Sequence, residues 1–251
     1  MRVFVILVRR EFGTYFTSLT GYVIISAVLF LIGFSFTEIL DRLNNDEPIT
    51  LPVTEIFYQT WYFWYVLLLA APLITMRAFA LEKAAGTFET LVTTPVSDAQ
   101  VVLAKFASAL MFFMTMWLPL LGCILTVRHY SSDQSAFNMG IVASTYLGIM
   151  LVGSLYMAMG CFASSLTRSQ IIAAMVGFSL GMAVFLISIR NVYGIPQAAW
   201  VTQYFGSISM MEHMQEFVRG VVDTRYVVFY LSGTAFFLFL TLKVVESRRW
   251  K

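Results

Sequence analysis

The residues best suited to chemistry lie in one short stretch, where His213 stands between Glu212 and Glu216 on an expected helix. An imidazole flanked by carboxylates is a combination that general acid–base catalysis uses. The same combination is typical of a solvated polar face at a membrane surface, and we favour this interpretation. The sequence has no HExxH pair for zinc, and His129 is its other histidine. We therefore assign no catalytic, cofactor or metal residue to the chain.

Other common chemical motifs are also missing from the sequence. It contains no GxxxxGK[ST], so it has no P-loop to hold nucleotide phosphates. Cys123 and Cys161 fall inside long apolar stretches, where we expect small buried side chains rather than a disulfide or metal site. No carboxylate lies inside an expected span, which argues against an intramembrane aspartyl protease and a proton-coupled carrier.

The composition is that of a membrane protein. Of 251 residues, 59% are hydrophobic and 12% are charged, against roughly 45–50% and about 25% in a soluble domain. The net charge of +2 is too small, and its basic residues are too scattered, to indicate nucleic acid as a partner.

Charge-free intervals mark where the chain can cross a bilayer, because a spanning helix needs about 20 mostly apolar residues. We expect an all-α membrane protein with one transmembrane domain over residues 1–251. The expected spans lie at about residues 19–38, 56–76, 105–127, 139–163, 169–189 and 226–245. Pro72 and Pro119 predict kinks, and Gly177 with Gly181 forms a GxxxG that permits close helix approach.

Seven aromatic residues crowd the start of the second span: Phe57, Tyr58, Trp61, Tyr62, Phe63, Trp64 and Tyr65. We interpret them mainly as an interfacial aromatic belt, with a substrate vestibule as the alternative.

The distribution of basic residues predicts the orientation, because Lys and Arg near span ends are retained in the cytoplasm. Of the 16 Lys and Arg residues, those that fall in outer segments when the N-terminus is inside are Arg42, Arg128, Arg190, Arg219 and Arg225. The others fall in inner segments, so both termini are predicted to be cytoplasmic.

Three amphipathic segments lie outside the spans. Residues 2–17 predict a helix lying on the inner membrane surface. Residues 77–97 predict a short cytoplasmic helix that ends before Pro95, with Leu81 on its apolar face and Glu82 opposite. This helix is either a surface connector or a docking helix for a soluble partner. Residues 207–225 predict a short helix that is half-inserted at the outer surface or re-enters the membrane from outside, because a seventh span would place the basic C-terminus outside.

Four stretches resemble the type-2 ABC exporter permeases, in particular the branch containing gliding-motility and copper-enzyme-maturation permeases. The stretches are RREF and YFTS at 9–12 and 15–18 with Gly21 and Tyr22, EKAAGTFETL with TPVS at 82–91 and 94–97, Glu212-His213 with Phe217, RGVVD at 219–223 and Arg225, and ESRRW at 246–250. They follow one another in the family's order along nearly the whole chain.

The resemblance implies a bacterial inner-membrane exporter in which two six-span subunits, identical or different, pair above two P-loop ATPase subunits. ATP and Mg²⁺ would bind in the ATPase and not in this chain. Residues implied at the ATPase contact are Phe79, Glu82, Gly86, Phe88, Glu89 and Leu91, and those implied in an outer-gate helix are Met211, His213, Phe217 and Arg219. Accessory periplasmic or membrane proteins are further expected partners.

Two other functions remain open on the sequence. The chain could be a mechanical or scaffolding membrane component that an ATPase moves without any solute crossing, since the same docking helix serves both purposes. A membrane enzyme using Glu212, His213 and Glu216 is the least favoured. The transported substrate is not predicted.

Overall fold

The computed structural model describes residues 2–44, 52–86, 97–130, 138–192 and 208–247, and this part of the chain is helical without β-strands. Its helices are α1 (Arg2–Thr17), α2 (Leu19–Asn44), α3 (Val53–Gln59), α4 (Tyr62–Thr75), α5 (Ala80–Ala85), α7 (Asp98–Met116), α8 (Leu118–Tyr130), α9 (Met139–Leu166), α10 (Gln170–Val192), α12 (Met210–Val218) and α13 (Thr224–Glu246).

Six stretches of the described chain are long and apolar enough to cross a membrane: Leu19–Arg42, Tyr62–Ala85, Asp98–His129, Met139–Leu166, Gln170–Ile189 and Thr224–Glu246. The expected all-α fold with six candidate spanning helices is therefore confirmed. The amphipathic segments at 2–17 and 207–225 do contain helices, α1 and α12, whose positions in the bilayer stay predictions.

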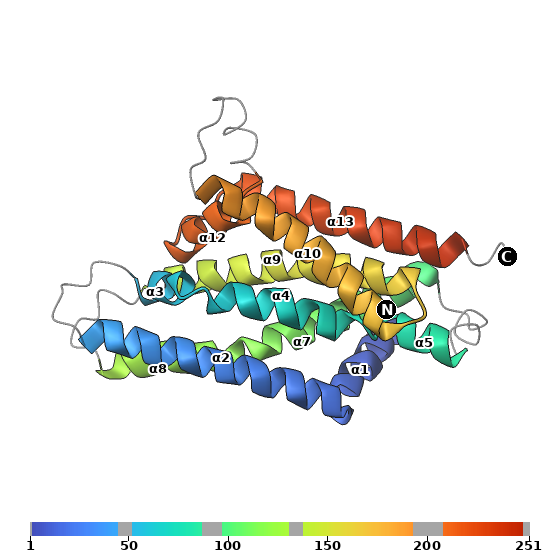
Figure 1. Ribbon diagram of the computed structural model, residues 1–251, viewed down its shortest axis with the longest axis horizontal. Coiled ribbons are helices and arrows are strands. Elements are labelled where there is room, and N and C mark those ends of the chain that lie inside the picture. The colour runs from blue at the N-terminus through green and yellow to red at the C-terminus, as the bar shows by residue number, and fades with distance from the viewer. Residues whose placement is uncertain (1, 45–51, 87–96, 131–137, 193–207, 248–251) are drawn as a thin grey trace.

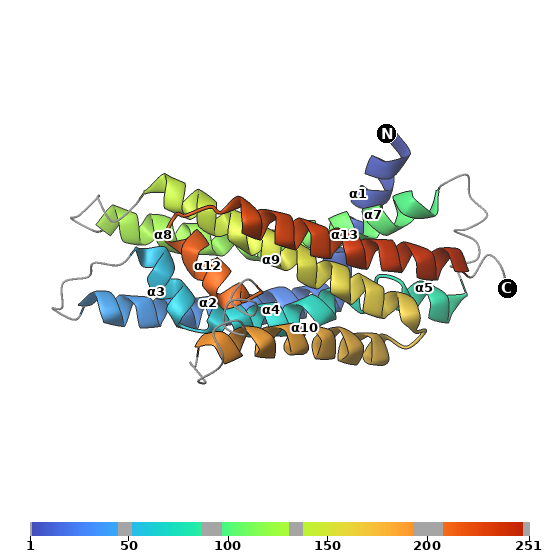
Figure 2. The ribbon, with the colours of Figure 1, turned by 90° about the horizontal axis from the view of Figure 1, so that it is seen from above.

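Helix α9 forms the centre of the bundle, in contact with α4, α7, α10 and α13 (Figures 1 and 2). In its most apolar stretch 83% of the residues are buried, against 17% in that of α13. Small residues let the neighbours approach: a Cβ on Gly160 would lie 2.0 Å from the Thr75 Oγ1 of α4. Because lipid and side chain are equally apolar, such close backbone packing is a main source of helix association in membranes.

The GxxxG of the fifth span packs against this same central helix. A Cβ on Gly181 would lie 2.8 Å from the Tyr156 ring of α9, and one on Gly177 would lie 3.7 Å from the Gly160 Cα. The structure thus identifies α9 as the helix that approaches α10 there.

The second span begins later than expected, because the chain breaks at Trp61. This residue has a left-handed backbone with φ of 64°, which separates α3 from α4. For a side chain other than glycine, that conformation costs on the order of 1–3 kcal/mol and persists only where surrounding contacts hold it. The Thr60 hydroxyl next to it bonds Ser35 of α2 at 2.9 Å.

The expected aromatic belt is in large part core. Phe57, Phe63 and Trp64 are buried, and the Phe63 ring centroid lies 5.4 Å from that of Trp117. Tyr65, by contrast, is exposed. The belt interpretation is therefore wrong for the buried members, whose rings fill the space between α3, α4 and α7.

The third span consists of two consecutive helices, α7 and α8, that meet at Trp117. Its N–H bonds the Met114 carbonyl three residues back at 3.1 Å, so the α-helical pattern is interrupted there. Pro119 follows two residues later, and its ring cannot continue an uninterrupted helix without a clash.

The shorter helices gather at the two ends of the bundle (Figure 1). One end carries α1, α5 and the C-terminal end of α13, and we call it the α5 end. The other carries α3 and α12, and we call it the α12 end. Figure 2 shows α1 crossing the direction of the spanning helices. The sharp turn from α1 into α2 requires glycine at 21, because a Cβ there would lie 1.9 Å from the Tyr15 carbonyl oxygen.

Candidate functional site

Helix α5 is fixed to the end of α9 by two serines. The N–H groups of Phe79 and Ala80 both donate to the Ser164 Oγ at 3.1 Å. The Lys83 ammonium donates to the Ser165 carbonyl oxygen. These bonds satisfy backbone donors that the first turn of a helix leaves unpaired. A displacement of α5 is therefore transmitted directly to the central helix.

The structure separates the residues implied at the ATPase contact. Phe79 is fully buried among residues of its own chain and so is not available for a contact with another protein. Leu81 is 44% exposed. Gly86 adopts φ of 72° and ends α5, so the expected continuous helix toward Pro95 is interrupted there. A left-handed glycine is a common helix end because it has no Cβ to clash. Phe88, Glu89 and Leu91 lie outside the described residues.

The polar side chains of α5 turn toward the neighbouring helices. Lys83 is buried, and Glu82 points to Lys105 of α7 with 2.7 Å between the Glu82 Oε1 and the Lys105 Nζ. These side chains have charged or polar partners inside the bundle. Leu81 is left on the outer surface.

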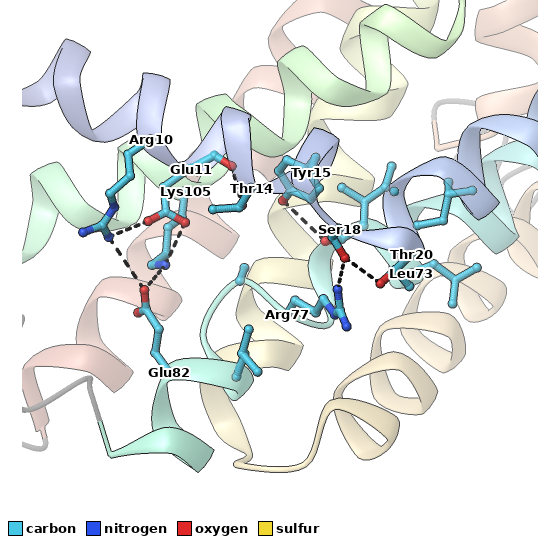
Figure 3. A pocket seen from close by; sticks show the side chains of 15 residues that line it. Arg10, Glu11, Thr14, Tyr15, Ser18, Thr20, Leu73, Arg77, Glu82 and Lys105 are labelled. Atoms are coloured by element: carbon cyan, nitrogen blue, oxygen red, sulfur yellow. Dashed lines mark hydrogen bonds and ion pairs between the residues drawn. The ribbon is translucent and has the colours of Figure 1, made fainter.

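Four charges from three helices form a cluster beneath α5, shown in Figure 3. Lys105 bonds Glu11 of α1 at 3.1 Å in addition to Glu82. Arg10 of α1 bonds Glu11 at 2.7 Å and lies 3.9 Å from Glu82. The Lys105 side chain is only 3% exposed. A buried ammonium without partners would cost several kcal/mol, and the two carboxylates offset that cost.

Glu11 is ionised in this cluster. Burial by itself disfavours its charged form, but the opposite charge of Lys105 and the hydrogen bond from Arg10 outweigh burial, so the pKa of Glu11 falls below its ordinary value. The cluster thus joins α1, α5 and α7 through ion pairs.

Sequence reasoning missed this cluster, although one signal pointed to it. Lys105 was placed at the edge of the third span, where a lysine reaches water without difficulty. The helix actually begins at Asp98, after a capping box formed by Ser97 and Gln100. Lys105 therefore lies two turns inside the helix, and a charge at such a depth requires a partner.

A cavity of about 330 Å³ adjoins the cluster. It lies between α1, the start of α2, and the segment joining α4 to α5, and its charged lining comprises Arg10, Glu11, Arg77, Glu82 and Lys105. Figure 3 shows Arg77 apart from the four-charge cluster, pointing to Ser18. The sequence did not mark Arg77 as a site residue.

At the α12 end, His213 lies inside the bundle. It is fully buried, its ring stacks on Tyr226 with 3.9 Å between centroids, and its Nδ1 lies 3.2 Å from the Tyr230 hydroxyl. The expected solvated position is therefore wrong. Glu212, the residue before His213, is exposed. Among the residues that the structure describes, no cluster of potential metal ligands is found.

Met211, Phe217 and Arg219 connect α12 to its neighbours. Met211 and Phe217 are buried, and the Met211 carbonyl accepts a bond from the Tyr58 hydroxyl of α3 at 3.0 Å. The Arg219 Nη2 and Nε lie 2.7 and 3.0 Å from the same Glu55 oxygen. Glu55 is only 2% exposed. Its carboxylate, which sequence reasoning did not single out, thus holds α12 against α3.

Comparison with known proteins gives one result for the family. The family described as "ABC-2 family transporter protein" matches residues 5–246, which include all six candidate spans. No curated protein matches the chain. The match extends over nearly the whole chain and agrees with its helical membrane fold. The chain therefore belongs to the ABC-2 transporter family, as a membrane-spanning component of an ABC transporter.

Proposed function

We propose that this chain is the permease subunit of an ATP-driven exporter of the bacterial inner membrane, working as a dimer with separate P-loop ATPase subunits. The family membership supports a transport role. Because the sequence contains no P-loop, we propose that ATP and Mg²⁺ bind in a separate ATPase subunit. The excess of Lys and Arg in segments near the α5 end supports a cytoplasmic position for that end and for both termini.

The observation that carries the proposal is the attachment of α5. Its backbone bonds Ser164 of α9, and its Glu82 shares Lys105 with Glu11 of α1. Removing one partner of a buried ion pair costs about 3–5 kcal/mol. Separating α5 from α1 and α7 is therefore unfavourable, and we expect these three helices to move together. A push on α5 therefore reaches two spanning helices and α1 at once.

Helix α5 also offers a surface for the ATPase. Leu81 is exposed at its outer side, next to exposed Ala84, Ala85 and Gly86. Phe88, Glu89 and Leu91 follow directly in the sequence and are proposed to extend this contact. An apolar helical face of this kind fits a groove on a soluble partner. ATP-driven closure of the ATPase pair then shifts the spans between two arrangements.

At the opposite end, α12 is proposed to form part of an outer gate. It is held by polar contacts to α3, including the Glu55–Arg219 pair. It also packs on α9, where a Cβ on Gly148 would lie 2.9 Å from the Phe217 Cβ. Movement of the central helix therefore reaches α12 through Phe217.

Co-purification with candidate P-loop ATPases tests the proposal. Leu81→Glu places a charge on the proposed docking surface and is expected to abolish the complex. Val221→Glu is the matched control, because Val221 is a comparably exposed apolar residue, at the α12 end. A complex that survives Leu81→Glu and Phe88→Glu together contradicts the docking role of this segment.

Reconstitution then separates export from mechanical work. Vesicles holding the permease dimer and the ATPase are expected to accumulate one member of a panel of lipids, glycans, peptides and drugs only with ATP. If the complex hydrolyses ATP and transports none of them, the mechanical alternative is favoured.

The branch of the family and any accessory proteins stay predictions.

A further inference from the structure

The cavity at the α5 end holds more positive than negative charge. Three cations line it, Arg10, Arg77 and Lys105, against two carboxylates, Glu11 and Glu82. Both carboxylates already pair with Lys105 and Arg10. Within the described ranges, no carboxylate lies within ion-pair distance of Arg77, which bonds the neutral groups of Ser18 and Gln170 instead. A half-buried guanidinium in this position favours an anion.

The groups around Arg77 are suited to a phosphate oxygen. The Ser18 hydroxyl bonds Arg77 and lies 2.8 Å from the Thr20 hydroxyl, so two hydroxyls and a guanidinium converge on one wall of the cavity (Figure 3). A guanidinium has five N–H donors, and its two bonds to Ser18 and Gln170 leave others for a ligand. The first turn of α2 starts at Leu19 beside them, and the N-terminus of a helix attracts anions.

The remainder of the cavity wall is apolar. Ile24 of α2 and Leu73 and Ile74 of α4 line it, and Leu73 is exposed. On α2, Tyr22 and Val23 lie exposed next to Ile24 at the start of a candidate span. A soluble anion would gain nothing from these surfaces. A ligand with an anionic head and a hydrocarbon tail matches both halves of the wall.

We propose that this cavity binds the headgroup of an anionic phospholipid, with its phosphate against Arg77, Ser18 and Thr20 and its acyl chains along α2 and α4. The volume of about 330 Å³ falls in the range of small-molecule sites, roughly 300–1,000 Å³. Basic pockets between membrane helices near the cytoplasmic surface are a known type of site for anionic headgroups. The proposal concerns lipid binding and does not depend on ATP-driven transport.

Such a lipid would be a structural ligand of the turn between α1 and α2. Ser18 is the residue between these helices, and Arg77 lies between α4 and α5. A phosphate bound to both therefore joins α1 and α2 to the segment that leads into α5. The lipid stabilises the folded chain in proportion to its occupancy.

The test measures unfolding of the purified full chain in neutral detergent, titrated with phosphatidylglycerol, phosphatidylcholine, glycerol phosphate or inorganic phosphate. Phosphatidylglycerol is expected to raise the unfolding temperature in a saturable way, and the other three are expected to have little effect. Stabilisation by glycerol phosphate or inorganic phosphate at the same concentrations would overturn the lipid assignment, because the tail would then contribute nothing. Equal stabilisation by phosphatidylcholine would overturn it as well.

Variants locate the site. Arg77→Gln is expected to weaken the phosphatidylglycerol response about tenfold or more, because a charge-assisted bond to the phosphate is lost. Arg168→Gln is the matched control: it removes an exposed arginine at the same end and leaves the response unchanged. If Arg77→Gln does not fold, Thr20→Ala takes its place with a smaller expected loss. Identical titrations for the wild type and the folded Arg77 or Thr20 variant would overturn the proposal.

Discussion

The ammonium of Lys105 lies 2.7 Å from the carboxylate of Glu82 and thereby ties the third span to α5, the helix proposed to meet the ATPase. Glu11 completes the arrangement from the α1 side, 3.1 Å from the same ammonium. Force applied at the surface thus enters the bundle through charges rather than through apolar packing alone.

Removing this ammonium is expected to destabilise the protein strongly. Lys105→Met leaves Glu11 and Glu82 close together without the cation between them, at a cost of about 3–5 kcal/mol. Lys243→Met is the control, since the exposed Lys243–Glu246 pair at 2.8 Å contributes about 0–1 kcal/mol. Unfolding temperatures in detergent give the comparison. Equal decreases in unfolding temperature for the two variants would show that the buried cluster contributes no more stability than an exposed ion pair.

The pH dependence of stability follows from Glu11. Its pKa is lower in the folded chain than the ordinary 4.5, so its ionisation contributes stability that is fully present above pH 4.5. That contribution disappears as the pH falls through the lowered pKa. The difference in unfolding temperature between wild type and Glu11→Gln should therefore be constant from pH 5 to 8 and shrink below about pH 4. A difference that grows on acidification contradicts this assignment.

The close packing at Gly160 predicts that a larger side chain at this position destabilises the protein. Gly160→Ala brings a Cβ to 2.0 Å from the Thr75 Oγ1 and should cost about 1–3 kcal/mol through overpacking. At Gly122 of α8 no atom lies within 4 Å of an added Cβ. Gly122→Ala is therefore expected to be neutral or to stabilise by about 0.5–1 kcal/mol, because alanine favours the helix. Thermal unfolding of the two variants checks the sign of each effect.

The contact between α3 and α12 depends on the charge of Arg219. Arg219→Gln leaves Glu55 buried without its cation, and we expect the free energy of unfolding to fall by about 1–2 kcal/mol. The expected loss is small for a buried carboxylate because the arginine is half exposed. Arg42→Gln breaks the exposed Arg42–Glu38 pair and should cost less than about 0.5 kcal/mol. Proteolysis at the α12 end provides a local readout: cleavage should accelerate in the Arg219 variant and remain unchanged in the Arg42 variant.

The spans were predictable because each depends on a local property, a run of uncharged apolar residues long enough for a bilayer. The same is true of the helix start at Ser97, whose hydroxyl and whose partner Gln100 are three residues apart. The break at Trp61 was not predictable, since nothing nearby in the sequence favours a left-handed tryptophan. Contacts from elsewhere in the fold hold that conformation.

The charged sites escaped prediction because their partners are far apart in the sequence. Lys105 is separated from Glu82 by 23 positions and from Glu11 by 94. Glu55 and Arg219 are 164 positions apart. Helical periodicity placed Leu81 and Glu82 on opposite sides of α5, yet it could not show that Glu82 faces a cation on another helix. The burial of His213 depends in the same way on Tyr226 and Tyr230 of α13.

The enclosure of α9 restricts where cargo recognition can evolve. The most apolar stretch of this helix is 83% buried and has little surface left for lipid, for a twin subunit or for a passing molecule. Substitutions in that stretch should report on folding. If the chain exports a solute as proposed, selectivity should be sought on the outward surfaces of α2, α10 and α13, whose apolar stretches are the least buried. Directed evolution toward a new cargo should therefore randomise those three helices and leave the central one untouched.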